Sequence, residues 1–237
     1  MRALDDRTAV VTGGSRGIGL AIVRSLAAHG ARVVLLARHP PAGRDAPQWL
    51  GAPPTMIACD LSHAADVERA LREIERSVGV PDLLVNNAGA FALGAIGEMP
   101  PSEVERMLAV NVLAPYRLLH TLVPAMRSRG RGHVVTIGSV ADRHAYPENA
   151  GYAAGKYGLR AMHEVLRQEL HGSGVRVSLV SPGPVDTPLW DPIQPETRPG
   201  FTPRARMLRP EAVADAVLWV ATRASEVNVD ELRLSHA

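Results

Sequence analysis

RTAVVTGGSRGIGLAIVRSLAAHG, residues 7–30, is the stretch of sequence that decides the fold. Its start, RTAVVTGG (7–14), is a run of apolar and β-branched residues that ends in glycines. From Gly17 onward, apolar residues recur at helical spacing until Gly30 stops the pattern. The stretch therefore predicts a buried strand, a tight glycine-rich turn and a helix, in that order.

The same alternation of strand and helix runs through the rest of the chain. Further strands are expected over 31–38, 55–60, 81–87, 132–139, 174–183 and 227–234. Further helices are expected over 63–79, 102–130, 150–172 and 210–222, with Ser102 as the N-cap of the longest. Alternation at this spacing builds βαβ units and a parallel sheet. The expected fold is α/β: a single doubly wound Rossmann domain over residues 1–237, with about seven strands and helices on both faces.

Two segments rich in proline interrupt this pattern. Residues 39–54 take the place of a helix, and their role stays open. Residues 184–210 follow a strand end, and loops of this length are uncommon unless they are functional or disordered. Because ligands of such folds bind at the carboxyl ends of the strands, this second segment is well placed to form a substrate lid.

The composition argues against several classes of protein. Apolar residues make up 46% of the 237 and charged residues 21%, which is typical of a soluble globular protein. The net charge is +2 and the arginines are scattered, so nothing indicates a nucleic-acid or membrane partner. No apolar run approaches the ~18 residues of a membrane span, and the first residues do not form a signal peptide. Cys59 is the only cysteine, so we expect a cytoplasmic protein without an internal disulfide, and the histidine spacing predicts no metal site.

The turn TGGSRGIG (12–19) predicts a site for a phosphate group. Its glycines let the backbone turn tightly and approach a ligand closely, while the helix N-terminus presents free N–H groups and partial positive charge. A glycine-rich turn is a weak signal alone, but this one lies between a strand and a helix, as in dinucleotide-binding proteins. A purely structural tight turn is the alternative.

The end of the second strand predicts which dinucleotide binds. An acidic residue there would bind the adenosine ribose hydroxyls, whereas arginine accommodates a 2′-phosphate. The sequence has Ala37 and then Arg38, and Arg16 adds a second cation from the glycine turn. Both arginines favour NADP(H) over NAD, the alternative being that they are simply solvated.

Two further strand ends carry polar side chains. Asp60 either accepts a hydrogen bond from the adenine amino group or caps the helix that follows. NNAG (86–89) either lines the nucleotide or locks the strand end through side-chain hydrogen bonds. We expect both roles for NNAG, with Asn87 the more structural of its two asparagines.

Lys156 is the only lysine among 26 cationic side chains, and it lies four residues after Tyr152. Tyrosine and lysine at this spacing share one face of a helix. Chance is one explanation for the single lysine. The functional explanation is that an ammonium group is compact where a guanidinium is a wide planar fork. A neighbouring ammonium would stabilise a phenolate and so lower the tyrosine pKa from its usual value near ~10.

Together these features resemble one family. TGGSRGIG, NNAG, Asn111, Ser139, YAAGK (152–156) and SPGPVDTP (181–188) occur in the order and spacing of the single-domain short-chain dehydrogenases/reductases. The resemblance extends from about residue 6 to residue 234. It implies a catalytic tetrad of Asn111, Ser139, Tyr152 and Lys156, in which Asn111 holds a water molecule that links Lys156 to solvent.

The resemblance and the chemistry of these residues predict the same reaction. Hydride transfer to a carbonyl carbon leaves an alkoxide that needs a proton, which Tyr152 can donate. Ser139, at a strand end, can hydrogen-bond the substrate oxygen as charge develops on it. We therefore expect an NADP(H)-dependent oxidoreductase that interconverts a carbonyl and a secondary alcohol. The alternatives are a non-catalytic NADP sensor, and a cofactor-free lyase or dehalogenase, on the same fold.

The motifs and the resemblance together predict which residues line the site. The predicted cofactor-binding residues are Gly13, Ser15, Arg16, Gly17, Ile18, Gly19, Arg38, Asp60, Leu61, Asn87, Ala88, Gly89, Tyr152, Lys156, Pro182, Gly183, Val185 and Thr187. The predicted substrate-binding residues are Ser139, Val140, Ala141, Tyr146, Asn149, Tyr152 and Trp190. Cations that could meet an anionic substrate are Arg143, His144, Arg198, Arg204 and Arg206. The resemblance also implies a homodimer or homotetramer, with the helices over 102–130 and 150–172 at its interfaces.

Overall fold

A computed structural model describes residues 2–39 and 49–237. Most of the proline-rich segment 39–54 therefore lies outside the described residues. The strands are β1 (Thr8–Thr12), β2 (Arg32–Ala37), β3 (Thr55–Ala58), β4 (Leu83–Asn86), β5 (Gly132–Ile137), β6 (Val175–Pro182) and β7 (Glu231–Leu234). The α-helices are α1 (Gly17–Ala28), α2 (Ala64–Val78), α3 (Pro101–Leu108), α4 (Ala114–Ser128), α5 (Ala150–Glu169) and α6 (Pro210–Ala221).

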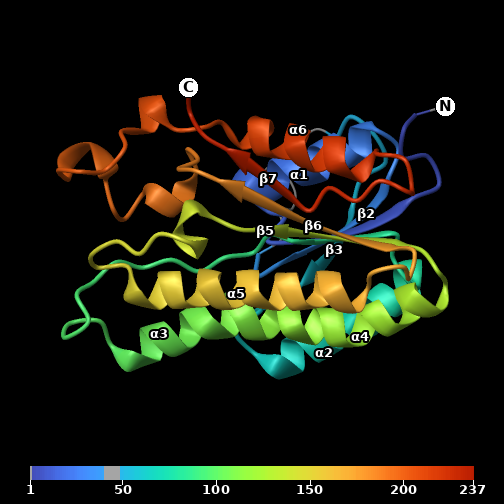
Figure 1. Cartoon of the computed structure of the whole chain (residues 1–237), viewed down its shortest axis with the longest axis horizontal. Coiled ribbons are helices and arrows are strands. Elements are labelled where there is room, and N and C mark those ends of the chain that lie inside the picture. The colour runs from blue at the N-terminus through green and yellow to red at the C-terminus, as the bar shows by residue number, and fades with distance from the viewer. Residues whose placement is uncertain (1, 40–48) are drawn as a thin grey trace.

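The described residues form seven strands, all parallel, in one sheet with the order β3-β2-β1-β4-β5-β6-β7. Helices α1 and α6 cover one face, and α2, α4 and α5 cover the other (Figure 1). Central strands are buried on both faces, which explains their continuous apolar sequences. The predicted doubly wound α/β fold is confirmed.

The order of the strands reverses direction at β1. The chain moves from β1 outward to β2 and β3, and then returns to the other side of β1 with β4. Ligands of doubly wound sheets bind at such a switch point, outside the carboxyl ends of the strands. Segment 184–210, orange in Figure 1, lies at this end of the sheet and contains three short 3₁₀ turns.

The helix predicted over 102–130 is in fact three pieces. A π-helical turn, Ala109–Leu113, separates α3 from α4 and contains Asn111. Turns of this type inside α-helices are rare and frequently occur at functional sites. Ser102 is not the N-cap: Pro100 takes that position without a side-chain cap, and Pro101 begins the helix, where its missing N–H has no cost.

No helix among those the structure describes is both long and apolar enough to cross a membrane.

Candidate functional site

A cavity of about 1260 Å³ opens at the carboxyl ends of the strands. Its walls come from the glycine turn, the ends of β2 to β6, α5 and segment 184–210. Every predicted cofactor-binding residue lines this cavity, and so does every predicted substrate-binding residue. Of the predicted tetrad only Asn111 does not line it.

The glycine turn has the conformation that its sequence requires. Gly13 and Gly17 have positive φ angles of +67° and +53°, which favour glycine. A Cβ atom at Gly19 would lie 2.1 Å from the carbonyl oxygen of Gly13 and 2.5 Å from Nδ2 of Asn87. The first turn of α1 is thus pressed against the ends of β1 and β4, and no larger residue fits at Gly19.

The N-terminus of α1 is suited to bind a phosphate group. Arg16 is the N-cap, but among the described residues no side chain accepts a hydrogen bond from the first-turn N–H groups. Those donors are the ones that a helix cannot satisfy by itself, and they point along the axis with the positive end of the helix dipole. Together with the glycine cradle, this uncapped end fits the diphosphate of a dinucleotide.

The adenosine end of the cavity carries positive charge. Arg16 and Arg38 both line it with exposed side chains. The Asp60 side chain binds a neighbouring residue: its Oδ1 accepts hydrogen bonds from the N–H (2.9 Å) and the hydroxyl (2.7 Å) of Ser62. Burial opposes ionisation of Asp60, but these hydrogen bonds outweigh it and hold its pKa below the usual range. Asp60 therefore caps the turn before α2, whose own N-cap is His63.

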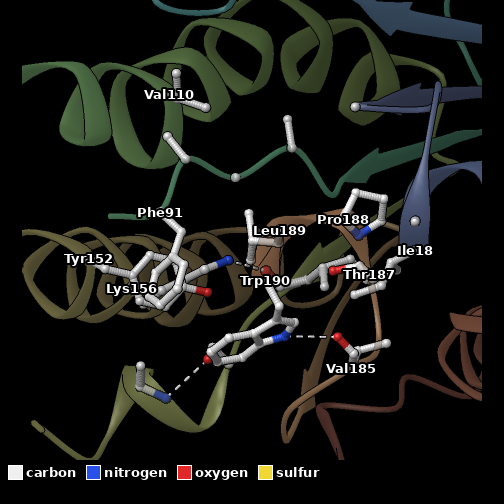
Figure 2. Close-up of a pocket in the computed structure, with 18 of the residues that line it drawn as sticks. Ile18, Phe91, Val110, Tyr152, Lys156, Val185, Thr187, Pro188, Leu189 and Trp190 are labelled. Carbon is white, nitrogen blue, oxygen red and sulfur yellow. Dashed lines mark hydrogen bonds between the residues drawn. The ribbon is translucent and has the colours of Figure 1, made fainter. Parts of the chain in front are cut away.

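Ser139, Tyr152 and Lys156 meet at the other end of the cavity. Ser139 follows β5, while Tyr152 and Lys156 lie one turn apart on α5 (Figure 2). The Nζ atom of Lys156 lies 5.7 Å from the centre of the Tyr152 ring and donates a hydrogen bond of 2.9 Å to the carbonyl of Ile137. Lys156 is only 4% exposed, and this burial lowers its pKa to about 8.

The pKa of Tyr152 differs from the sequence-based expectation. We expected Lys156 to lower it, but burial raises it to about 12, while a hydrogen bond with Ser139 lowers it in part. The physical reason is burial, which disfavours the charged phenolate, and the negative charge of Asp142 acts in the same direction. Tyr152 in this state is a protonated phenol.

Asn111 is buried beside the site and binds the backbone of Ala90. It is 1% exposed, and its side-chain Oδ1 accepts a hydrogen bond of 2.8 Å from the N–H of Ala90. Its Nδ2 donates one of 2.9 Å to the carbonyl of the same residue. The side chain fixes the segment after β4, so the water expected between Lys156 and solvent would have to bind other groups of the π-helical turn.

Comparison with known proteins identifies the family of the chain. The model of the family described as short chain dehydrogenase matches residues 7–198. The chain belongs to the short-chain dehydrogenase family. An uncharacterised oxidoreductase of Staphylococcus epidermidis is 30% identical over 234 residues, covering 99% of both chains.

Further members of the family are similar over most of the chain. The 3-oxoacyl-[acyl-carrier-protein] reductase FabG of Escherichia coli is 31% identical over 92% of this chain and 91% of its own. A crystal structure of a metagenomic short-chain oxidoreductase in complex with NADP is 34% identical, with a TM-score of 0.81 and 99% of both chains covered.

Sequence analysis missed one buried charge in this short-chain dehydrogenase. Asp142 is 1% exposed, and its Oδ2 accepts hydrogen bonds from the Ser139 N–H (3.2 Å) and the Ser181 hydroxyl (2.7 Å). Its Oδ1 pairs with Arg143 at 2.8 Å. Burial opposes ionisation of Asp142, but these hydrogen bonds outweigh it and keep its pKa below the usual range. The signal was available: Ser139 and Asp142 form a capping box, S-x-x-D.

The cations proposed for an anionic substrate are mostly directed elsewhere. Only Arg198 lines the cavity, whereas Arg143, His144, Arg204 and Arg206 do not. Arg143 pairs with Asp142 and with Glu231 of β7, and Arg204 pairs with Asp186 and Asp191 within segment 184–210. The expectation for Arg143 and Arg204 was wrong because these long-range and loop contacts have no sequence signature.

Two phenylalanine side chains complete the wall of the cavity. Phe91 and Phe201 line it, and sequence analysis did not identify either.

Within residues 2–39 and 49–237, no three His, Cys, Asp or Glu side chains are grouped so that they could hold a metal ion.

We expect the Asp142→Asn substitution to lower the pKa of Lys156 further below 8. Burial lowers this pKa, whereas the negative charge of Asp142 raises it. Removing that charge should therefore lower the pKa of Lys156 further. Because the chain has a single lysine, NMR of protein labelled with ¹³C at lysine Cε gives one side-chain resonance to titrate.

The wild-type protein should titrate near pH 8, well below the 10.5 of a free lysine. Glu231→Gln is the control, because it removes the other partner of Arg143 and leaves Asp142 charged. An unchanged or higher Lys156 pKa in Asp142→Asn would contradict the assignment.

Proposed function

We propose that this protein is an NADP(H)-dependent oxidoreductase that interconverts a carbonyl group and a secondary alcohol. The observation that carries the proposal is one cavity with two ends. An uncapped helix N-terminus and a glycine cradle lie at one end, and Ser139, Tyr152 and Lys156 meet at the other. A bound nicotinamide dinucleotide would supply or accept the hydride at the second end.

The side chains of the protein bind the carbonyl oxygen of the substrate and transfer the proton. The hydroxyls of Ser139 and Tyr152 hold the carbonyl oxygen, and Tyr152 donates its proton to that oxygen in the reduction direction. A phenol with a pKa near 12 is fully protonated at neutral pH, as this step requires. The ammonium of Lys156 donates one hydrogen bond to Ile137 and keeps two further protons for the cofactor ribose and for the phenolate left by proton transfer.

The preference for NADP(H) rests on the second strand end and the glycine turn. Arg38 and Arg16 both line the cavity, and the buried Ala37 leaves no acid to bind a ribose hydroxyl. The metagenomic relative in complex with NADP supports this preference. The backbone of Val185 and the side chain of Thr187 are placed to hold the nicotinamide side, and segment 184–210 serves as the substrate lid of a single-domain enzyme.

Replacement of Tyr152 by phenylalanine should abolish turnover but not cofactor binding. We expect kcat with NADPH to fall by roughly 10²–10⁴, because the general acid is lost and the ring is kept. The assay is NADPH oxidation against ketones, aldehydes, diketones and keto acids, with NADPH binding measured separately.

Tyr157→Phe is the matched control, since this exposed tyrosine on α5 does not line the cavity. Equal turnover in Tyr152→Phe and wild type would contradict the mechanism. Tight NADPH binding without turnover of any carbonyl would instead favour the non-catalytic sensor.

Replacement of Arg38 by glutamine should weaken the binding of NADPH more than the binding of NADH. A charged hydrogen bond to the 2′-phosphate contributes about 1.5–3 kcal/mol, so the Kd for NADPH should rise roughly ten- to a hundredfold. The Kd for NADH, which lacks that phosphate, should change little. Arg24→Gln, on the exposed face of α1, is the control for a general loss of charge. Equal losses for NADPH and NADH would show that Arg38 does not select the cofactor.

We also propose that the protein forms a homodimer or homotetramer through α4 and α5. These helices and the π-helical turn expose large apolar side chains: Leu113, Tyr116, Tyr157 and Val165. Exposed apolar groups on adjacent helices are typical of an interface. Light scattering should give a mass of two or four times 25.3 kDa, and a monomer mass at micromolar concentration would contradict the proposal. The expected cytoplasmic location stays a prediction.

A further inference from the structure

We infer that the substrate is a ketone with an uncharged aromatic ring next to its carbonyl group, together with the corresponding secondary alcohol. The inference rests on the proposed function and names the class of molecule that the substrate end of the cavity accepts. It starts from where the chain places its few aromatic side chains.

Aromatic residues are scarce in this protein and concentrate at the cavity. The chain has two Phe, three Trp and four Tyr. Both Phe line the cavity, as do Tyr146, Tyr152 and Trp190. In the part of the chain that the structure describes, no aromatic side chain belongs to the buried core, which consists of aliphatic residues, methionine and Cys59. These rings are therefore not needed to fill the interior of the fold.

Four of the rings form a continuous series that begins at the catalytic phenol. The Phe91 ring lies 4.8 Å from that of Tyr152 and 5.5 Å from that of Trp190, in edge-to-face geometry with both. Trp190 in turn meets Phe201 edge to face at 6.3 Å. Figure 2 shows Phe91 and Trp190 beside Tyr152 in the cavity. A substrate whose oxygen reaches Tyr152 would place its neighbouring substituent against these rings.

The ring series comes from three separate segments of the chain. Phe91 follows β4, Tyr152 belongs to α5, and Trp190 and Phe201 belong to segment 184–210. The indole Nε1–H of Trp190 donates a hydrogen bond of 3.0 Å to the carbonyl of Val185. That bond fixes the indole before any substrate arrives. Preorganised aromatic walls favour a ligand that is itself planar, because aromatic pairs gain from edge-to-face or offset contacts beyond the area they bury.

The charges around these rings disfavour an anionic substrate. Among the described residues, two arginines line the cavity apart from Arg16 and Arg38, and each is paired with a glutamate. Arg198 contacts Glu148 at 2.7 Å, and Arg106 contacts Glu103 at 2.9 Å. A carboxylate or phosphate on the substrate would have to compete with these glutamates for the two guanidinium groups. An uncharged ring leaves both pairs intact.

The test compares one pair of ketones matched in size, a phenyl and a cyclohexyl compound, with a keto acid and a keto thioester. We would measure kcat/KM with NADPH for acetophenone, cyclohexyl methyl ketone, acetoacetate and acetoacetyl-N-acetylcysteamine. Acetophenone should exceed cyclohexyl methyl ketone by roughly three- to tenfold and should exceed acetoacetate by more. Phe91→Leu should reduce the phenyl-over-cyclohexyl ratio toward one, because it removes a ring and keeps apolar volume. Trp219→Leu, an exposed residue of α6 outside the cavity, should leave the ratio unchanged.

A binding measurement covers the case in which none of these ketones is turned over. Calorimetry on the complex with NADP⁺ would compare 1-phenylethanol with 1-cyclohexylethanol, and the phenyl compound should bind at least roughly threefold more tightly. Equal or weaker binding, or faster turnover of the aliphatic ketone or thioester, would overturn the inference and leave the proposed function standing. Failure to bind NADPH at all would instead remove the proposed function.

Discussion

The site depends on a set of hydrogen bonds that joins the end of β1 to the end of β4. We call this set, formed by Thr12, Val85, Asn87 and Ala88, the clamp. The Thr12 hydroxyl donates to the carbonyl of Val85 (3.3 Å) and accepts from the backbone N–H groups of Asn87 and Ala88 (both 3.0 Å). Asn87 completes the clamp by donating from Nδ2 to the carbonyl of Thr12 at 2.8 Å. These bonds join residues more than 70 positions apart and satisfy polar groups at a point where the sheet ladder ends. The glycine turn can approach a ligand closely because this clamp holds both strand ends behind it.

The second organising feature is the burial of Lys156. Removing an ammonium from water is costly, and the fall of its pKa to about 8 expresses that cost. Two groups offset it: the carbonyl of Ile137, which accepts its hydrogen bond, and the ionised Asp142 nearby. Asp142 is itself held by Ser139, Ser181 and Arg143, and Arg143 continues to Glu231 on β7. Ser139 and Lys156 are thus linked through one buried carboxylate to the last strand.

The cavity divides according to charge. Arg16, Arg38 and the uncapped helix N-terminus give its nucleotide end a positive potential, which suits a phosphorylated cofactor. At the other end Arg198 is neutralised by Glu148, and the walls near Tyr152 are aromatic and aliphatic. One continuous cavity can therefore hold a highly charged dinucleotide beside an uncharged substrate.

Local sequence patterns by themselves predicted about seven strands, the doubly wound fold and the glycine turn, while the family resemblance added residues of the loop after β6. Apolar periodicity and glycine spacing act over a few residues, and the carboxyl ends of parallel strands meet at one edge whatever the details of packing. Only the tertiary structure decided the π-helical turn at Asn111, the direction of Arg143, and the meeting of Phe91 with Trp190. Each depends on a partner far away in the chain: Ala90 for Asn111, Glu231 for Arg143, and Trp190 for Phe91. Such contacts are set by packing and by the pairing of buried polar groups, which become definite only when distant segments are brought together.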